Sequence, residues 1–227
     1  ENFRFVRKQY NVQRNYERLK ALRSLLPVPL IYAYDGITLD MEYIHGLDMK
    51  NYLLHNDPSE LSEFLRDSLD RCMQRYQVKD YTETYNEMLQ FLDNETVFPF
   101  TKEQLIAKLP KHLPSSPYHG DMTLENIIHG TDGAFVFIDP VTVKYDSYVF
   151  DVAKLRQDLD CKWFLRNSIL NFDPKLLKIK EQVLEFVPEA MNDNLLILML
   201  LRVYLHCEID SLEYNFIMRE VHRLWKS

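Results

Sequence analysis

The beginning of the chain alternates in hydrophobicity and then changes to a helical period. Phe3 and Phe5 fall on one side of an extended segment whose other side is mostly charged, so residues 3–9 are predicted to form a half-buried strand. Apolar and aromatic side chains then recur every three or four positions over residues 12–26. This period predicts one amphipathic helix that Pro27 ends.

Two further strands are predicted around a tight turn. Residues 30–34 and 38–44 are rich in β-favouring side chains and flank Asp35-Gly36, a dipeptide typical of hairpins. Between Gly46 and Pro110 almost every apolar position follows a helical period. The chain therefore changes from a strand-rich segment to a helical one near Gly46.

A second hairpin is predicted inside the helical part. Residues 127–129 and 134–138 read as strands, and Asp132-Gly133 lies in the loop that joins them. The segment after Asp151 is helical in period again, and one helix is predicted to start at Asp173-Pro174. The fold class that follows is α+β, with a small strand-rich start and a larger helical remainder.

Composition excludes several classes of protein. The 227 residues are 46% hydrophobic and 13% aromatic, which is typical of a globular protein and not of a disordered one. The net charge of -7 leaves no excess of basic residues for a nucleic-acid backbone. The most apolar window, Leu195–Leu201, is too short to span a bilayer. Three cysteines fit no disulfide framework, so a reducing cytoplasm is the expected location.

The segment from His119 to Ile128 carries the clearest chemistry. Transfer of a phosphoryl group needs a carboxylate that orients the attacking hydroxyl, and oxygen ligands for a Mg²⁺ ion that bridges the phosphates. Asp121, Asn126 and Asp139 supply these groups. Asn126 enters the predicted hairpin and Asp139 leaves it, so both are expected at the same end, close to Asp121.

This arrangement resembles the catalytic and metal loops of the protein-kinase-like superfamily. The matching residues are His119, Asp121 and Asn126, with Asp139 after the hairpin. Gly120 and the Ile-Asp-Pro sequence around Asp139 are similar to the aminoglycoside phosphotransferase and choline kinase branch, which phosphorylates small molecules. The resemblance implies a two-lobed fold, with a short nucleotide-binding lobe in residues 1–45 and a helical lobe in residues 46–227.

The resemblance also implies roles and ligands. Asp121 would be the catalytic base, Asn126 and Asp139 would bind Mg²⁺, and His119 would support the catalytic loop. Asp151, in the Asp-Val-Ala stretch, would brace that loop. The expected reaction moves the γ-phosphate of ATP, or of another nucleoside triphosphate, to a hydroxyl of a small molecule such as an amino alcohol, a sugar or a glycan precursor.

The nucleotide side of the resemblance rests on fewer residues. Lys8 would contact the phosphates and be held by Glu17 on the following helix, although Arg7 is the rival for this position. Glu42 and Ile44 lie in a segment that resembles the hinge between the lobes, where backbone groups bind the adenine edge. No feature of the sequence sets an oligomeric state.

The sequence lacks a glycine-rich phosphate loop, because its five glycines are scattered. Two explanations fit a chain that begins with Glu1 at the lysine-bearing strand: a segment upstream of this residue, or a nucleotide lobe that is itself shortened. The alternative function is a pseudokinase-like module that binds nucleotide or serves as a scaffold without efficient catalysis. The presence of Asp121, Asn126 and Asp139 favours catalysis over this alternative.

Overall fold

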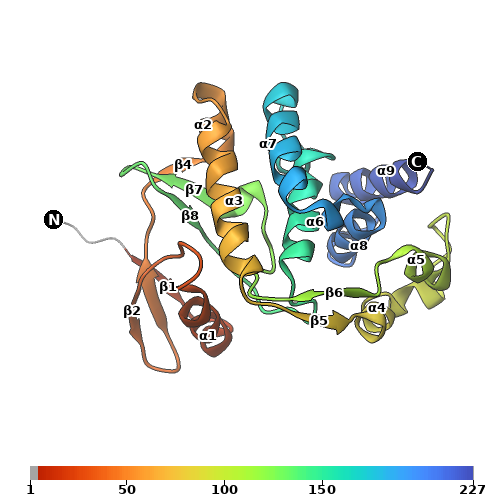
Figure 1. Ribbon diagram of the computed structural model, residues 1–227, viewed down its shortest axis with the longest axis horizontal. Helices are drawn as coiled ribbons and strands as arrows, with labels where there is room; N and C mark the ends of the chain where they lie inside the picture. The colour runs from red at the N-terminus through yellow and green to blue at the C-terminus, as the bar shows by residue number, and fades with distance from the viewer. Residues whose placement is uncertain (1–4, 227) are drawn as a thin grey trace.

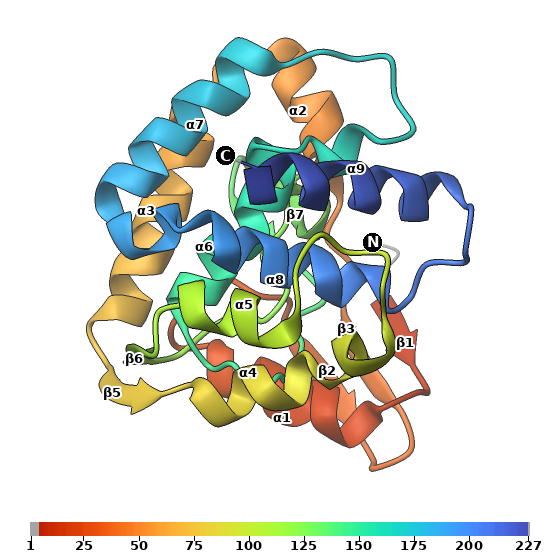
Figure 2. The same ribbon diagram turned by 90° about the vertical axis from the view of Figure 1, so that its right-hand side faces the viewer.

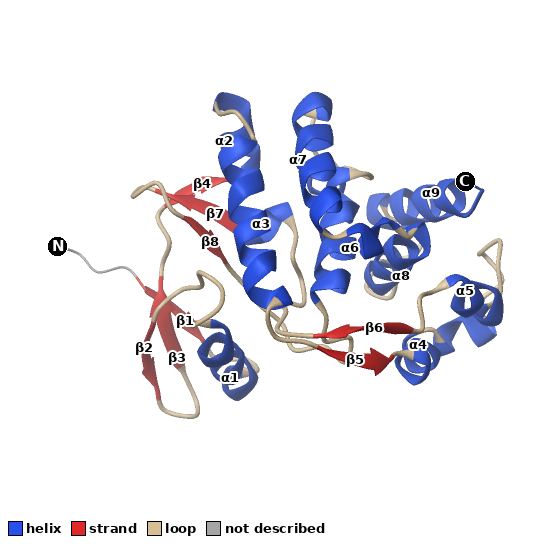
Figure 3. Cartoon of the chain, viewed as in Figure 1, coloured by secondary structure: helices blue, strands red, loops and turns tan. Residues whose placement is uncertain are grey.

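The strands of the protein form small antiparallel sheets, and helices make up most of the rest (Figures 1 and 3). The computed structural model describes residues 5–226. Within them, the first sheet has the order β1-β3-β2 and consists of β1 (Phe5–Lys8), β2 (Ile31–Tyr34) and β3 (Leu39–Glu42). The predicted strands are therefore confirmed where they are described, while Phe3 and Arg4 lie outside the described residues.

Helix α1 (Val12–Leu22) follows β1 and packs on the first sheet. Val12, Leu19 and Leu22 are its buried residues, and the ring of Tyr16 stacks on Tyr34 of β2 with centroids 4.0 Å apart. The helix ends four residues earlier than predicted. Pro27 disfavours helical geometry in the residue before it, so residues 23–26 form a turn instead.

The predicted second hairpin is confirmed and forms the centre of a second sheet. It consists of β7 (Ile127–Gly130) and β8 (Phe135–Phe137), and β4 (Gly46–Asp48) pairs with the free edge of β7. Figure 1 shows this sheet between the first sheet and the helices. Since β4 follows β3 after only three residues, the second sheet is tied directly to the first.

The prediction that residues 46–110 are almost entirely helical is wrong at β4, at residues 95–101 and at a further strand. Strand β5 (Gln77–Asp80) interrupts the helices and pairs with β6 (His112–Ser115). Both strands are only four residues long, and β5 contains a single apolar side chain, Val78, which is exposed. Such a strand gives no periodic signal that a sequence pattern could detect.

Helix α6 is the buried helix against which its neighbours pack. In chain order after α1 the helices are α2 (Met49–His55), α3 (Ser59–Met73), α4 (Thr82–Met88), α5 (Lys102–Lys108), α6 (Tyr148–Leu159), α7 (Asp173–Phe186), α8 (Asp193–Tyr204) and α9 (Leu212–Lys226). Every residue of α6 is buried, and α3, α7 and α8 pack against it (Figure 2). The helix predicted at Asp173-Pro174 begins there. None of the described helices is long and apolar enough to cross a membrane.

The connection between the first two sheets requires a glycine. Gly46 lies opposite Gly130 of β7, and a Cβ atom on Gly46 would lie 2.1 Å from the carbonyl oxygen of His129. We expect Gly46→Ala to lower the free energy of unfolding by about 2 kcal/mol or more, because backbone atoms must shift. Gly133 is the control, since its φ of 84° is left-handed but nothing lies within 4 Å of an added Cβ. Gly133→Ala should cost only about 1 kcal/mol.

Denaturant unfolding of the two variants measures this difference. Equal costs for Gly46→Ala and Gly133→Ala would contradict the close approach of β4 to β7.

Candidate active site

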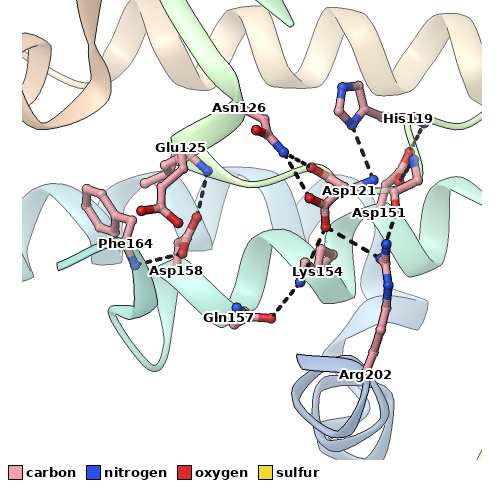
Figure 4. A network of polar contacts seen from close by, with 12 residues as sticks. His119, Asp121, Glu125, Asn126, Asp151, Lys154, Gln157, Asp158, Phe164 and Arg202 are labelled. Atoms are coloured by element: carbon pink, nitrogen blue, oxygen red, sulfur yellow. Dashed lines mark hydrogen bonds and ion pairs between the residues drawn. The ribbon is translucent and has the colours of Figure 1, made fainter. Parts of the chain in front are cut away.

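The loop after β6 places Asp121 beside Asn126 (Figure 4). The amide nitrogen Nδ2 of Asn126 donates to the backbone oxygen of Asp121 at 2.8 Å and to its Oδ2 at 3.0 Å. The backbone N–H of Ile138 donates to the backbone oxygen of Asn126 at 2.9 Å. The residue next to Asp139 is thus hydrogen-bonded to Asn126, so the hairpin brings these predicted site residues together.

His119 connects the two ends of this arrangement. Its ring is fully buried, its Nδ1 accepts the backbone N–H of Asp121 at 3.3 Å, and its Nε2 lies 3.0 Å from the backbone oxygen of Ile138. The two contacts fit a neutral ring with the proton on Nε2. Burial agrees with this state, because it lowers the pKa of His119 to about 4. The ring therefore links the two ends of this arrangement in its neutral form.

Two buried carboxylates of α6 hold the backbone of the loop. Asp151 accepts the N–H of His119 at 2.5 Å and that of Gly120 at 2.7 Å. Asp158 makes a similar link further along the loop, where it accepts the N–H of Leu124 at 2.6 Å. Burial raises the pKa of both carboxyl groups to about 7, although these N–H donors oppose the shift. The loop is therefore fastened to α6 on both sides of Asp121.

Gly120 is required where the loop turns. Its φ of 89° is left-handed, and a Cβ atom would lie 2.3 Å from the backbone oxygen of Val141. Val141 in turn donates its N–H to the backbone oxygen of His119 at 3.0 Å. The glycine that distinguishes this loop from a protein-kinase loop thus has a steric reason here.

Two cations face the carboxylate of Asp121, and the sequence analysis missed both. Its Oδ1 lies 3.4 Å from Nζ of Lys154 on α6 and 3.5 Å from NH1 of Arg202 on α8. Lys154 is 5% exposed and also donates to Oε1 of Gln157 at 3.0 Å. NH1 of Arg202 donates to the backbone oxygen of Gly120 at 2.8 Å. One oxygen of Asp121 therefore faces positive charge and the other faces an amide.

The sequence did contain signals for these two residues. Lys154 follows Asp151 by three positions on the same helix, so both side chains lie on one face. Arg202 interrupts the most apolar stretch of the chain. A charged residue in a buried helix needs a partner, and this requirement could have directed attention to it.

Lys8 does not pair with Glu17, which corrects the sequence prediction. Nζ of Lys8 instead lies 2.5 Å from Oδ1 of Asp139. Glu17 is exposed and accepts a hydrogen bond from Gln13 at 2.9 Å, because it lies on the outer face of α1. The helix presents Arg18 inward, with its guanidinium carbon 3.7 Å from the ring centroid of Tyr118.

The geometry also separates Lys8 from its rival. Arg7 forms two hydrogen bonds with Asp40 of β3, at 2.7 and 2.6 Å, on the face of the strand opposite to Lys8. Only Lys8 therefore contacts the candidate metal residue Asp139. The predicted hinge residues Glu42 and Ile44 lie at the end of β3 and in the link to β4. The N–H of Glu42 is already bonded to the backbone oxygen of Leu30.

The side-chain oxygens of Asn126 and Asp139 are suitable ligands for a Mg²⁺ ion. The amide nitrogen of Asn126 donates to Asp121. The amide oxygen of Asn126 has no hydrogen bond within residues 5–226, so it is available to a metal ion. Asp139 is a half-exposed carboxylate with a left-handed φ of 51°. Residues 5–226 contain no group of three His, Cys, Asp or Glu side chains that could hold a metal. Mg²⁺ is commonly held by one or two protein oxygens together with phosphates, and these two residues match that requirement.

Comparison with known families identifies the class of protein. The model of the phosphotransferase enzyme family matches residues 3–173, and the chain belongs to this family. Arg202 lies outside the matched residues. None of the curated proteins matches the chain significantly.

Solved structures share the fold at low sequence identity. Choline kinase LicA from Streptococcus pneumoniae is 14% identical with a TM-score of 0.58, and the match covers 100% of this chain and 87% of that one. A choline/ethanolamine kinase family protein from Mesorhizobium loti is 16% identical with a TM-score of 0.60, over 98% and 82%. Ethanolamine kinase from Plasmodium vivax is 12% identical with a TM-score of 0.56, over 98% and 76%.

The buried Asp151 predicts a pH dependence of stability. Its pKa is raised from 3.8 to about 7, so the folded state binds more protons than the unfolded state between these values. Its contribution to the free energy of unfolding must therefore fall as the pH rises from about 4 to 7. We expect the cost of Asp151→Asn to be greater at pH 4 than at pH 8, by up to about 4 kcal/mol.

Urea unfolding of both proteins across this pH range measures the difference. A cost that is independent of pH, or that grows with pH, would contradict a protonated Asp151 in the folded protein.

Proposed function

We propose that the protein is an ATP-dependent phosphotransferase that moves the γ-phosphate to a hydroxyl of a small molecule. The observation that supports this proposal is that Asn126 donates a hydrogen bond to Asp121 while Lys8 forms an ion pair with Asp139. A carboxylate for the hydroxyl, two oxygen ligands for Mg²⁺ and a lysine for the phosphates are the groups that phosphoryl transfer requires. Membership of the phosphotransferase enzyme family agrees with this chemistry.

In the proposed mechanism Asp121 orients the acceptor hydroxyl and takes its proton. The hydrogen bond from Asn126 and the two cations at Oδ1 hold this carboxylate in place. Mg²⁺, held by Asn126 and Asp139, would neutralise charge on the phosphates. Lys8 would release Asp139 and contact the phosphates when nucleotide binds, since an ammonium group can change partner by rotating its flexible stem.

We further propose that residues 1–45 are a nucleotide-binding lobe and that residues 46–227 form the helical lobe that carries the acceptor. The first sheet with α1 would cover the nucleotide, and Glu42 and Ile44 would border its adenine edge. Choline and ethanolamine are the substrates named for the solved relatives. From family membership alone, the acceptor classes to consider for this chain are amino alcohols, sugars and glycan precursors.

A second candidate function rests on the missing glycine-rich loop. The described glycines that lie before the catalytic loop are Gly36, in a turn, and Gly46, at β4, and neither belongs to a phosphate-binding loop. A module that binds nucleotide without efficient catalysis would not need such a loop. A module without catalysis would not require Asn126, Lys154 and Arg202 to hold Asp121. Their contacts with this carboxylate therefore favour the enzymatic function.

Replacement of Asp121 tests the catalytic proposal. We expect Asp121→Asn to reduce ADP formation from Mg-ATP and a panel of alcohols by about 100-fold or more, since it removes the proton acceptor. Calorimetric affinity for Mg-ATP should change little, whereas Asp139→Ala should lose the binding that depends on Mg²⁺. Unchanged turnover in Asp121→Asn would remove this residue from the mechanism.

Lys8 and Arg7 form a matched pair for the nucleotide site. We expect Lys8→Met to weaken ATP binding about tenfold or more, because it removes a charge from the phosphate side. Arg7→Met should leave ATP affinity unchanged, since Arg7 binds Asp40 on the other face of β1. Calorimetric titration of both variants decides between them, and a larger loss in Arg7→Met would reverse the assignment.

A further inference from the structure

A cavity of about 280 Å³ lies next to the candidate active site. It is open to solvent and is lined by α8 with Leu205, by residues 88–91 and by residues 143–145, and most of its walls are apolar. Its polar or charged wall residues are Lys144, Tyr145 and Arg202, and none of its lining residues is acidic. Arg202 also touches Asp121, so one side chain joins the cavity to the proposed catalytic carboxylate.

Arg202 is the cation that this cavity offers to a ligand. Its NH1 is engaged by Gly120 and Asp121, whereas its Nε and NH2 have no hydrogen-bond partner within residues 5–226. The other cation, Lys144, is mostly exposed and bound to Glu87 at 2.5 Å. A guanidinium with free N–H groups on an apolar wall is well suited to binding an anionic oxygen.

The carboxylates around the cavity do not offset this positive charge. Glu87 is bound by Lys144, which lines the cavity. Asp121 itself faces Lys154 as well as Arg202. An ammonium group on the acceptor, a few bonds from the hydroxyl that meets Asp121, would therefore approach two cations.

Tyr145 adds a polar group in the same wall. Its side chain is 6% exposed, and its hydroxyl has no hydrogen-bond partner within the described chain. A desolvated hydroxyl without a partner is costly, and a ligand oxygen that reached it would relieve that cost. The guanidinium carbon of Arg202 lies 5.4 Å from the Tyr145 ring centroid, so the two groups are neighbours.

We propose that the acceptor is an anionic alcohol, with a compact apolar framework in this cavity and a carboxylate or phosphate group bound by Arg202. This inference rests on the proposed phosphotransferase function and specifies its acceptor. The substrate class differs from the amino alcohols named for the solved relatives. Arg202 is then the residue that determines specificity by charge.

Three 4-substituted cyclohexanols, whose substituents are anionic, neutral and cationic, test the proposal. They are 4-hydroxycyclohexanecarboxylate, 4-methylcyclohexanol and 4-aminocyclohexanol, titrated into the full chain with Mg-ATP analogue present. The readout is the side-chain Nε resonance of Arg202, which is identified by its disappearance in Arg202→Gln. We expect the carboxylate to shift this resonance and to bind at least about tenfold more tightly than the other two.

The matched variants assign the preference to one residue. Arg202→Gln should reduce the preference for the carboxylate over the other two alcohols to about threefold or less, as judged by saturation-transfer NMR of the ligands. Arg219→Gln is the control, because Arg219 is an exposed cation on α9 that contacts Glu220. Should Arg202→Gln fail to fold, the affinities of the three alcohols for the wild-type protein still decide whether an anionic acceptor is preferred.

Several outcomes overturn the proposal. They are equal or tighter binding of the amine, equal binding of the neutral alcohol, and an Arg202 resonance that the carboxylate does not move. Tighter binding of the amine would point instead to the cavity of about 310 Å³ that Trp163, Glu208 and Glu213 help to line. Failure of the phosphotransferase function is read separately, from the loss or absence of Mg-ATP binding in the calorimetric titrations.

Discussion

The carboxylate of Asp151 is the interaction on which the candidate site depends. It is buried in the central helix α6 and accepts the backbone N–H groups of His119 and Gly120. A buried carboxylate is unfavourable without donors, and buried N–H groups are unfavourable without acceptors. Each therefore requires the other, and Asp158 repeats the arrangement at Leu124. The geometry of the candidate catalytic loop is fixed by the core of the protein, although Asp121 itself remains accessible.

Much of this arrangement could be predicted because its signals are local. The spacing of His119, Asp121 and Asn126 lies within one loop, and a hairpin with Asp-Gly in its turn necessarily returns Asp139 to the same end. The period of α1 and the start of α7 were equally readable. These features depend on neighbours in the sequence, so no knowledge of tertiary packing was needed.

The rest depends on contacts between segments far apart in the sequence. Lys8 and Asp139 are separated by more than half of the chain, so no local pattern could pair them. The period of α1 does place Glu17 opposite the buried residues of the helix, but only packing shows that Arg18 meets the ring of Tyr118. Strand β5 exists because β6 pairs with it, and not because of its own composition. Such features follow from how α1, α6 and α8 meet at the loop, and a sequence pattern does not contain that information.

The division between what is shared and what is particular has a physical basis. The fold is shared with solved structures at identities of only 14% and 16%, and in this chain the brace at Asp151, the turn at Gly120 and the hairpin hold the loop. None of these features lines the cavity of about 280 Å³ beside Arg202. The wall that would touch an acceptor includes α8, which lies beyond the residues matched by the family model. Because Arg202 on that helix contacts both the loop and the cavity, a change in this single side chain alters the charge that an acceptor meets while the brace at Asp151 stays intact.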